Sequence, residues 1–575
     1  MQTVMFRPRR RREGGWLKWL VLASGLLAMG IGMWAAWLNF VPNSRQVKPD
    51  YGSSYPIMVH GKAMAEGAIV DGDAVKLPLP VIQDDLGLKD NVYYEEKSGS
   101  IVLTNTDKVL RLKTNALTAT INSKPYELRV AAEVKDKLVY IPSTPIEELY
   151  GIRIEYDKQT KIVTVLKSGE AVQRAKAPKG AVIRPQATIR APIVERLTKN
   201  AEVRVWGEGE GWYQVQSESG IIGYAAKKDL QLSQVEHIER QEFKPPFVAW
   251  KLPGSKINLT WEAVYQKNPD TDNIAAMNGV NVVSPSWFEL IDGSGHIRSK
   301  ADIDYVNWAH KQGMQVWGLF SNGFEPVRTT QALGSVDSRF SMIQQLLAYV
   351  KLYNLQGINL DFENVNTSDK ANLVQFVREL TPLLHDQGIT VSIDVTPKSN
   401  SEFWSLFLDR SSLGKIVDYM ILMAYDEHWA SSPLAGSVAS LPWVEKSLVR
   451  ILEEDQVPPA KLVLGMPLYT RLWTEKKDEN GAVKVSSKAL GMESVKSLIA
   501  QKKLTPVLDL KAGQHYVEYT ENGVLQRIWI EDDLSIKARV GLAKKYGLAG
   551  VATWQRAFQS SEVWDIIHQS LTKSP

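Results

Sequence analysis

The stretch LQGINLDFENVN, from Leu355 to Asn366, decides how the C-terminal part of this chain folds. Its apolar residues are Ile358, Leu360 and Phe362, and the polar residues between them are Asn359, Asp361 and Glu363. Alternate residues of a β-strand face opposite sides, so one side of this strand is apolar and the other carries two carboxyl groups. Burying carboxylates is costly unless they are paired or hydrogen-bonded. A strand with such a polar side indicates a functional site.

Apolar runs of this kind recur after residue 256 and alternate with segments of helical pattern. The runs are INLTWEAV, GVNVVSPSWFEL, QVWGLFSN, GINLDFEN, TVSIDVTP, VDYMILMAYDEH, LVLGMPLYTRLW and GLAGVATWQRA, and the helical segments are 300–312, 337–353, 368–386 and 533–546. Strands that alternate with helices pair in parallel through right-handed crossovers. The pattern predicts an α/β fold, a (β/α)₈ TIM barrel over residues 250–570. An α+β insertion is expected at 475–530, between the seventh and eighth strands.

The barrel fold determines which way the stretch faces. Barrel strands are covered by helices outside and by packed side chains inside, and barrel enzymes place their chemistry at the carboxyl ends of the strands. The apolar residues suit the helix side, which turns Asn359, Asp361 and Glu363 inward. The alternative is that an acid here caps the next helix, near Thr367 and Ser368. A cap needs one acid outside the barrel, whereas this strand carries a series of polar residues on its inner side. We therefore predict that Glu363 and Asp361 are catalytic.

Three short motifs resemble glycoside hydrolase family 18. QGINLDFE is similar to the family's DGxDxDxE at the end of the fourth barrel strand, and MAYD (423–426) is similar to its MxYD on the sixth. Trp554 fits the tryptophan that closes the eighth strand, whereas FSNGF, with Ser321 and Gly323, is only a loose match to the third-strand SxGG. Two positions depart from the family pattern, because Gln356 and Asn359 replace its first two aspartates.

The resemblance implies a substrate-assisted, retaining mechanism, in which the N-acetyl oxygen of the sugar attacks the anomeric carbon. In that mechanism Glu363 protonates the leaving oxygen and then activates water, and Asp361 orients the acetamido N–H. Tyr425 would donate a hydrogen bond to the acetamido oxygen, and Asp426 would contact the sugar or support Glu363. Trp554 would form the floor under the sugar. Packing inside the barrel is the alternative for Tyr425 and Trp554.

Asn359 is grouped with the substrate-binding residues, directly below Asp361. Its amide can donate a hydrogen bond but can neither share a proton with Asp361 nor repel it electrostatically. We therefore predict that Asp361 ionises more readily than it would beside an aspartate. Other tryptophans, Trp287, Trp429, Trp473 and Trp529, could stack on a polysaccharide, with core packing as the alternative for each.

The N-terminal segment carries the basic charge of the chain. Six basic residues and Glu13 give +5 over residues 1–18, so the total of +4 leaves −1 for the rest and no basic surface for nucleic acid. Residues 19–44 carry no charge, and a spanning helix needs about 20 apolar residues. We predict a cytoplasmic basic arm (1–18) and a transmembrane anchor (19–42), with the catalytic domain extracellular in a single-pass cell-membrane protein. A cleaved signal peptide is the alternative.

Two further domains are expected between the anchor and the barrel. Residues 56–167 resemble the copper amine oxidase N-terminal-like domain and repeat internally, with Pro78 matching Pro142 and Gly87 matching Gly151. Residues 181–232 resemble the bacterial SH3-like domain, in which Trp212, Tyr213 and Tyr224 either contact a wall ligand or form the core. Residues 45–55 and 168–180 are polar and are expected to be linkers.

The sequence predicts no cofactor and no metal. The chain has no cysteine, and its eight histidines show no spacing typical of a zinc site. The function predicted is a membrane-anchored glycosidase that cleaves β-1,4 bonds of N-acetylglucosamine polymers, with the cell wall as partner and peptidoglycan or chitin as substrate. A non-catalytic, lectin-like wall-binding protein is the alternative, but a lectin does not need an acid at position 363.

Overall fold

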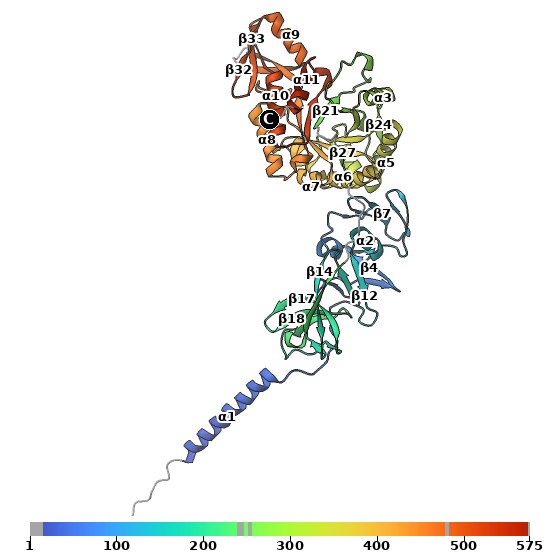
Figure 1. Ribbon diagram of the computed structural model, residues 1–575, viewed down its shortest axis with the longest axis vertical. Helices are drawn as coiled ribbons and strands as arrows, with labels where there is room; N and C mark the ends of the chain where they lie inside the picture. The colour runs from blue at the N-terminus through green and yellow to red at the C-terminus, as the bar shows by residue number, and fades with distance from the viewer. Residues whose placement is uncertain (1–14, 239–246, 251–255, 478–481, 573–575) are drawn as a thin grey trace, which may run out of the picture. The chain divides into compact units, whose positions relative to one another are not determined.

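The computed structural model describes residues 15–238, 247–250, 256–477 and 482–572 (Figure 1). They form two compact units. The first takes its residues from 1–93, 112–118 and 127–242, and the second from 94–111, 119–126 and 243–575.

In the described part of the second unit, eight parallel strands close into a barrel, coloured from green to red in Figure 1. Each strand pairs with the next, β22 pairs directly with β25, and β35 returns to β21. The strands are β21 (Ile257–Glu262), β22 (Val282–Pro285), β25 (Gln315–Ser321), β26 (Gly357–Asp361), β27 (Thr390–Val395), β28 (Tyr419–Met423), β29 (Leu462–Pro467) and β35 (Gly550–Trp554). The TIM barrel predicted from the apolar runs is confirmed.

Helices follow the barrel strands and include the four segments predicted from the sequence. They are α3 (Ile303–Lys311), α4 (Pro326–Gly334), α5 (Val336–Tyr353), α6 (Lys370–His385), α7 (Arg410–Ile416), α8 (Leu441–Glu453), α10 (Asp533–Lys545) and α11 (Val563–Thr572), with short turns η3 (Thr271–Asn273), η4 (Thr367–Asp369), η5 (Glu402–Leu406), η6 (Pro459–Lys461) and η7 (Arg556–Phe558). Asp369 occupies the N-cap position of α6, although its side chain makes no capping hydrogen bond, and Glu363 lies well before that position.

The two sides of β26 face as the alternation predicts. The ring of Phe362 packs against Phe376 of α6, with ring centroids 5.8 Å apart. Asn359 contacts Trp261 of β21 and Asp394 of β27, which places it inside the barrel. The strand ends at Asp361, so Glu363 lies two residues beyond its end, in the loop at the barrel mouth.

The insertion forms an α+β layer of its own. It contains β30 (Tyr469–Lys477), β31 (Val483–Gly491), α9 (Met492–Lys502), β32 (Val507–Asp509), β33 (Gln514–Glu521) and β34 (Val524–Ile530), and its sheet order is β31-β30-β34-β33-β32. It begins at Tyr469, earlier than the expected 475, because β30 follows β29 after a single residue. A core of Val495, Val517, Ile528 and Ile530 holds α9 on the sheet.

Two smaller β-structures complete the second unit. The hairpin β23 (Phe288–Leu290) and β24 (Ile297–Ser299) extends the barrel sheet beside β25. A five-stranded sheet, most of whose residues belong to this unit, consists of β5 (Val92–Glu95), β6 (Ser100–Thr104), β7 (Val109–Lys113), β8 (Thr118–Ile121) and β9 (Lys124–Glu127).

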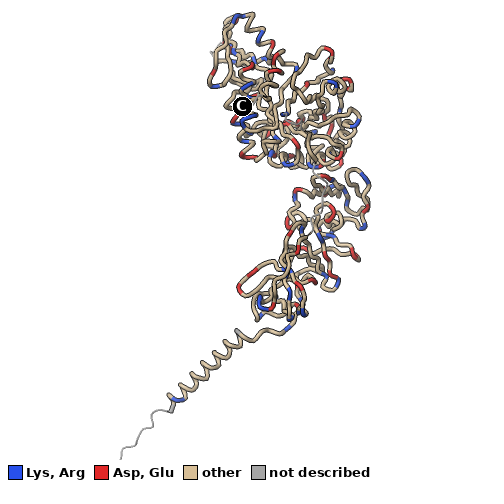
Figure 2. Tube along the Cα trace, viewed as in Figure 1, with Lys and Arg blue, Asp and Glu red and all other residues tan. Residues whose placement is uncertain are grey.

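The first unit begins with α1 (Gly15–Phe40), an exposed helix. Its segment Trp16–Trp37 is long and apolar enough to cross a membrane. Figure 2 shows this helix without charged residues beyond its first turns, where Lys18 lies. The expected anchor at 19–42 therefore lies almost entirely within one helix.

The internal repeat is visible in the order of elements. One copy contains β4 (Ala74–Pro78) and the turn η1 (Val81–Asp85), and the other contains β11 (Leu138–Pro142) and α2 (Ser143–Tyr150). Gly87 and Gly151, which follow the two helical segments, both have positive φ angles of 71° and 64°.

The two copies meet where β4 pairs with β11. Tyr140 is opposite Pro78 and Pro142 is opposite Lys76. With the repeat spacing of 64, residue 76 is equivalent to residue 140 and residue 78 to residue 142. Each pair therefore maps onto the other pair when the two copies are exchanged, as it would about a twofold axis. The outer neighbours are β3 (Ile69–Asp71) and β10 (Glu133–Lys135), and a second sheet contains β1 (Ile57–Val59), β2 (Lys62–Ala63), β12 (Arg153–Tyr156) and β13 (Val163–Leu166).

The second small domain of this unit is a five-stranded antiparallel sheet in the order β19-β18-β17-β14-β20. Its strands are β14 (Ala171–Ala177), β17 (Ala201–Gly209), β18 (Trp212–Ser217), β19 (Ile222–Ala226) and β20 (Gln231–His237), accompanied by β15 (Ala181–Ile183), β16 (Glu195–Leu197) and η2 (Lys227–Asp229). The prediction of a linker over 168–180 is wrong, because β14 pairs there with both β17 and β20. Polar side chains on its exposed face concealed the strand.

Candidate active site

Glu363 is held at the barrel mouth by its own backbone. The buried side chain of Asn322, just after β25, accepts a hydrogen bond from Glu363 N at 3.1 Å and donates one to Glu363 O at 2.8 Å. The same amide also donates to Thr329 Oγ1 of α4 at 2.9 Å. This clamp fixes the direction in which the Glu363 side chain leaves the loop. Asn322 lies inside FSNGF, between the two residues that the loose family match considered.

Asp361 and Glu363 form a hydrogen-bonded pair of carboxyl groups. Asp361 is buried, whereas Glu363 is half-buried and reachable from the mouth. Burial raises the pKa of Glu363, and the negative charges of Asp361 and Asp426 raise it further. Because a raised pKa keeps a carboxyl group protonated toward neutral pH, Glu363 is suited to donate a proton.

Asn359 lies beneath this pair and exposes none of its surface. Its Oδ1 accepts from Trp261 Nε1 at 2.9 Å and from Ser284 Oγ at 3.1 Å, and its Nδ2 donates to Asp394 Oδ1 at 2.8 Å. Its hydrogen bonds are thus made within the barrel, so any effect on the substrate is indirect.

Asp394 of β27 is the acid that faces Asp361 from outside its own strand. Burial raises the pKa of Asp361 well above its usual range, and the charge of Asp394 adds to this. The hypothesis that Asp361 ionises readily considered only position 359 and overlooked this neighbour. The comparison with an aspartate at position 359 stays a prediction. The signal for Asp394 was its place as the only charged residue in the strand TVSIDV.

Tyr425 and Asp426 follow β28 at the same mouth. Asp426 has a φ of 59°, and its Oδ1 accepts from Tyr469 Oη at 2.5 Å and from Arg471 Nη2 at 3.4 Å. Burial raises the pKa of Tyr425, so its hydroxyl stays neutral and can donate a hydrogen bond. Tyr469 and Arg471 belong to β30, and sequence reasoning missed both because the insertion was expected to start after them.

Aromatic rings line the barrel beside the carboxyl pair. Trp554 is half-buried at the end of β35, and its ring centroid is 6.0 Å from that of Trp261. Trp261 also meets Tyr425 edge to face at 6.4 Å. Trp554 can therefore present part of its ring to a ligand while the remainder packs inside the barrel.

The other four tryptophans differ in their exposure. Trp287 and Trp473 are fully buried and donate to Asn268 Oδ1 and Gly436 O, so stacking on a polysaccharide is wrong for both. Trp529 is half-buried against Tyr516. Trp429, after β28, is 52% exposed and remains available.

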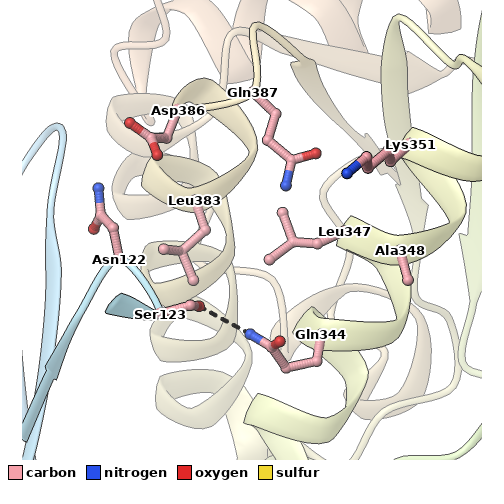
Figure 3. Close-up of a pocket in the computed structure, with 9 residues that line it drawn as sticks. All are labelled: Asn122, Ser123, Gln344, Leu347, Ala348, Lys351, Leu383, Asp386 and Gln387. Carbon is pink, nitrogen blue, oxygen red and sulfur yellow. Dashed lines mark hydrogen bonds between the residues drawn. The ribbon is translucent and has the colours of Figure 1, made fainter. Parts of the chain in front are cut away.

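A shallow pocket on the outer, helical side of the barrel is a different feature (Figure 3). Its lining comes from α5, from the end of α6 and from the turn between β8 and β9, where Gln344 Nε2 donates to Ser123 Oγ at 2.9 Å. It contains none of the predicted site residues. Among the described residues, no group of three or more His, Asp or Glu side chains is placed to hold a metal ion.

Three family models match the chain. Residues 317–558 match the model described as glycosyl hydrolases family 18. The chain carries a family 18 glycoside hydrolase domain. The match includes β26, the loop with Glu363, Tyr425, Asp426 and Trp554. Residues 58–165 match the copper amine oxidase N-terminal domain, and residues 179–231 match the bacterial SH3 domain.

Relatives of this glycoside hydrolase occur in Bacillus. The chain is 26% identical over 302 residues to the uncharacterized glycosylase YvbX of Bacillus subtilis, which covers 50% of this chain and 84% of that protein. It is also 26% identical over 263 residues to the cortical fragment-lytic enzyme of Bacillus anthracis, which covers 45% of this chain and 59% of that enzyme.

Solved structures share the fold of the family 18 domain. The C-terminal domain of a putative chitinase from Desulfitobacterium hafniense matches with a TM-score of 0.50 and 25% identity, covering 55% of this chain and 99% of that one. The spore cortex-lytic enzyme SleL of Bacillus megaterium matches with a TM-score of 0.50 and 20% identity, covering 56% of this chain and 76% of that one.

Proposed function

We propose that this glycoside hydrolase is anchored in the cell membrane and cleaves β-1,4 bonds of N-acetylglucosamine-containing polymers outside the cytoplasm. The observation that supports this most strongly is the carboxyl pair at the barrel mouth, in which a buried Asp361 is hydrogen-bonded to a half-buried Glu363. A partly exposed proton donor that is held by a largely buried second acid suits glycosidic bond cleavage.

The pair supports a substrate-assisted mechanism over a protein nucleophile. Asp361 is only 8% exposed and is hydrogen-bonded to Glu363, so its oxygens are poorly placed to attack an anomeric carbon. In our proposal the acetamido oxygen of the sugar makes that attack, with retention of configuration. Glu363 protonates the leaving oxygen and then removes a proton from water, while Asp361 accepts a hydrogen bond from the acetamido N–H.

Tyr425, Asp426 and Trp554 complete the proposed sugar site. The neutral hydroxyl of Tyr425 donates to the acetamido oxygen, and the exposed carboxylate of Asp426 accepts from a sugar hydroxyl. The half-exposed ring of Trp554 supports the apolar face of the sugar. Trp429 offers a further stacking surface on the loop after β28.

We propose peptidoglycan as the polymer, with chitin as the second candidate. The cortical fragment-lytic relative supports peptidoglycan, and so does the bacterial SH3 domain, in which Trp212, Tyr213 and Tyr224 are half-buried and keep part of their surface available. The putative-chitinase relative supports chitin. The helix α1 would act as the membrane anchor with the basic arm in the cytoplasm, which keeps the enzyme at the wall.

The test compares purified peptidoglycan and chitin oligomers as substrates of the full chain in detergent. We expect new reducing ends from peptidoglycan, and Glu363→Gln should lower turnover by about 100-fold or more because the proton donor is lost. Glu402→Gln, an exposed acid on the loop after β27, is the matched control and should retain activity. The first product should have the β-anomeric configuration.

Two outcomes separate the alternatives. Equal turnover by the Glu363→Gln variant and the unsubstituted chain would rule out the proposed acid. Binding of wall fragments without turnover by either protein would instead identify a lectin.

A further inference from the structure

Asp394 lies beside the carboxyl pair but belongs to another strand. Leu360 of β26 is paired with Ile393 of β27, so Asp361 and Asp394 each follow a paired residue on adjacent parallel strands. Asp394 is 2% exposed, and its Oδ1 accepts a hydrogen bond from Asn359 Nδ2 at 2.8 Å. It is therefore too deeply placed to touch a substrate, although it is one strand away from Asp361.

The amide of Asn359 is held in one orientation. Two donors, Trp261 Nε1 and Ser284 Oγ, both point at its Oδ1, which directs the NH₂ group at Asp394. An amide NH₂ can only donate, so it favours the carboxylate form of Asp394 over the protonated form. Burial raises the pKa of Asp394 well above its usual range, and the Asn359 amide opposes that rise by stabilising the carboxylate form.

The other titratable groups around Asp394 are carboxyls and a phenol. Asp361 and Glu363 face it from β26 and the loop that follows, and Tyr425 faces it from the end of β28. One oxygen of Asp361, Oδ1, is buried and has no hydrogen-bond partner among the described residues. Further out at the mouth, Asp426 is paired with Tyr469 and Arg471.

Three acids so close together in a buried site resist full ionisation. We propose that Asp394 is a positioning residue whose buried carboxylate, held by the Asn359 amide, keeps a proton on the Asp361–Glu363 pair. The pair is then ready to deliver that proton to the leaving oxygen. This inference rests on the proposed function and extends it to a residue outside the strand that carries the acid pair.

The experiment exchanges the two groups across their hydrogen bond. Asp394→Asn removes the charge with little change in volume. The double variant Asn359→Asp, Asp394→Asn restores one carboxylate and one amide in the opposite order. Ser392→Ala is the matched control, because Ser392 is an equally buried polar residue on the same strand. Circular dichroism and thermal unfolding establish that each variant is folded.

We expect Asp394→Asn to lower kcat by about 10-fold or more, with KM changed by less than about threefold, because substrate contacts are kept. The basic limb of its pH–kcat profile should move to lower pH, since the pair loses its proton more easily without the neighbouring charge. The double variant should recover most of kcat and the original basic limb, and Ser392→Ala should resemble the unsubstituted chain.

The possible failures are distinguishable. No hydrolysis by the unsubstituted chain overturns the proposed function. An active chain whose Asp394→Asn variant keeps the same kcat and pH profile overturns the inference alone. A folded double variant that stays as slow as Asp394→Asn also overturns the inference. A carboxylate at position 359 would then fail to replace the one at position 394.

Discussion

At the scale of single residues, the feature that governs the site is the hold of Asn322 on the backbone of Glu363. A catalytic side chain on a loop is only as well placed as its main chain, and here one buried amide satisfies both the N–H and the C=O of residue 363. Because the same amide reaches α4 through Thr329, the acid is tied to the barrel wall.

Asn322→Ala should therefore affect both stability and catalysis. It leaves the Glu363 N–H and C=O without these partners, and each unsatisfied buried group costs about 1–3 kcal/mol. We expect a lower free energy of unfolding in urea and a lower kcat at unchanged wall binding. Asn322→Asp keeps the oxygen that accepts from Glu363 N. Its free energy of unfolding and its kcat should therefore lie between those of the unsubstituted chain and those of Asn322→Ala. Unchanged kcat in the alanine variant would show that the loop is positioned by other contacts.

Asp426→Asn should change the pH dependence of the reaction. The negative charge of Asp426 raises the pKa of Glu363, so removing it lowers that pKa. Because the acid must be protonated to act, activity should be lost at lower pH in the variant, and the basic limb of the pH–kcat profile moves toward acid. A basic limb that stays in place or moves toward alkaline pH contradicts this assignment.

A third prediction concerns the stability cost of Asp361. Burial raises its pKa above the unfolded value, so the ionised form is disfavoured in the folded state and stability falls as pH rises through the folded pKa. Asp361→Asn removes this loss and should unfold at a higher temperature than the unsubstituted chain at alkaline pH, while hydrolysing poorly. The difference should disappear at acidic pH, and thermal scans at several pH values measure it.

Much of the residue-level site was predictable because it lies along one strand and its loop. The alternation in LQGINLDFENVN places Asp361 on the barrel interior without any knowledge of the partners. Asp394, Asn322 and Arg471 were not predictable in the same way, because their roles depend on contacts between strands far apart in the sequence. For Asp394 alone the sequence offered a signal, because it is the only acid in the apolar run TVSIDV.

At the scale of elements, α5 and α6 are joined by a buried ion pair. Arg339 donates to Glu379 Oε1 at 2.8 Å, and Gln375 donates to the same oxygen at 2.9 Å. Both charged side chains are buried. These two helices flank β26 in the sequence, so the pair supports the strand that carries the site.

Glu379→Ala should destabilise the barrel by about 3–5 kcal/mol, because the buried guanidinium of Arg339 loses this carboxylate. The double variant Arg339→Met, Glu379→Leu should be less destabilised than the single one, since it removes both charges and keeps the volume. Urea unfolding of the three proteins tests this. Equal loss in the single and double variants would mean that packing outweighs the charge.

The predictions of helices and strands succeeded where the hydrophobic pattern was clear, and one failed where a polar strand resembled a linker. The barrel strands are buried on both sides and produce apolar runs, so their order could be read directly. The linker predicted over 168–180, which includes β14, rests on polar residues such as Glu170, Gln173 and Lys176. Val172, Ala175 and Ala177 of β14 are nevertheless buried, and the register of the strand shifts between Gln173 and Ala175.

At the scale of the whole molecule, α1 is the element that would determine where the enzyme works. It is 26 residues long, and at about 1.5 Å per residue such a helix is long enough to cross a bilayer. We predict that the full chain floats with lipid vesicles and that deletion of residues 15–40 abolishes flotation. Turnover of a soluble oligosaccharide should be the same for both proteins. Flotation of the deleted chain would place the membrane contact elsewhere.

The pairing of β4 with β11 bears on how this chain arose. Two equivalent edges cover each other in a self-complementary register, which is the arrangement of a symmetric homodimer contact. An ancestor with only one copy would have needed a second molecule to shield that edge. Tandem gene duplication would then have turned an intermolecular pairing of strands into an intramolecular one.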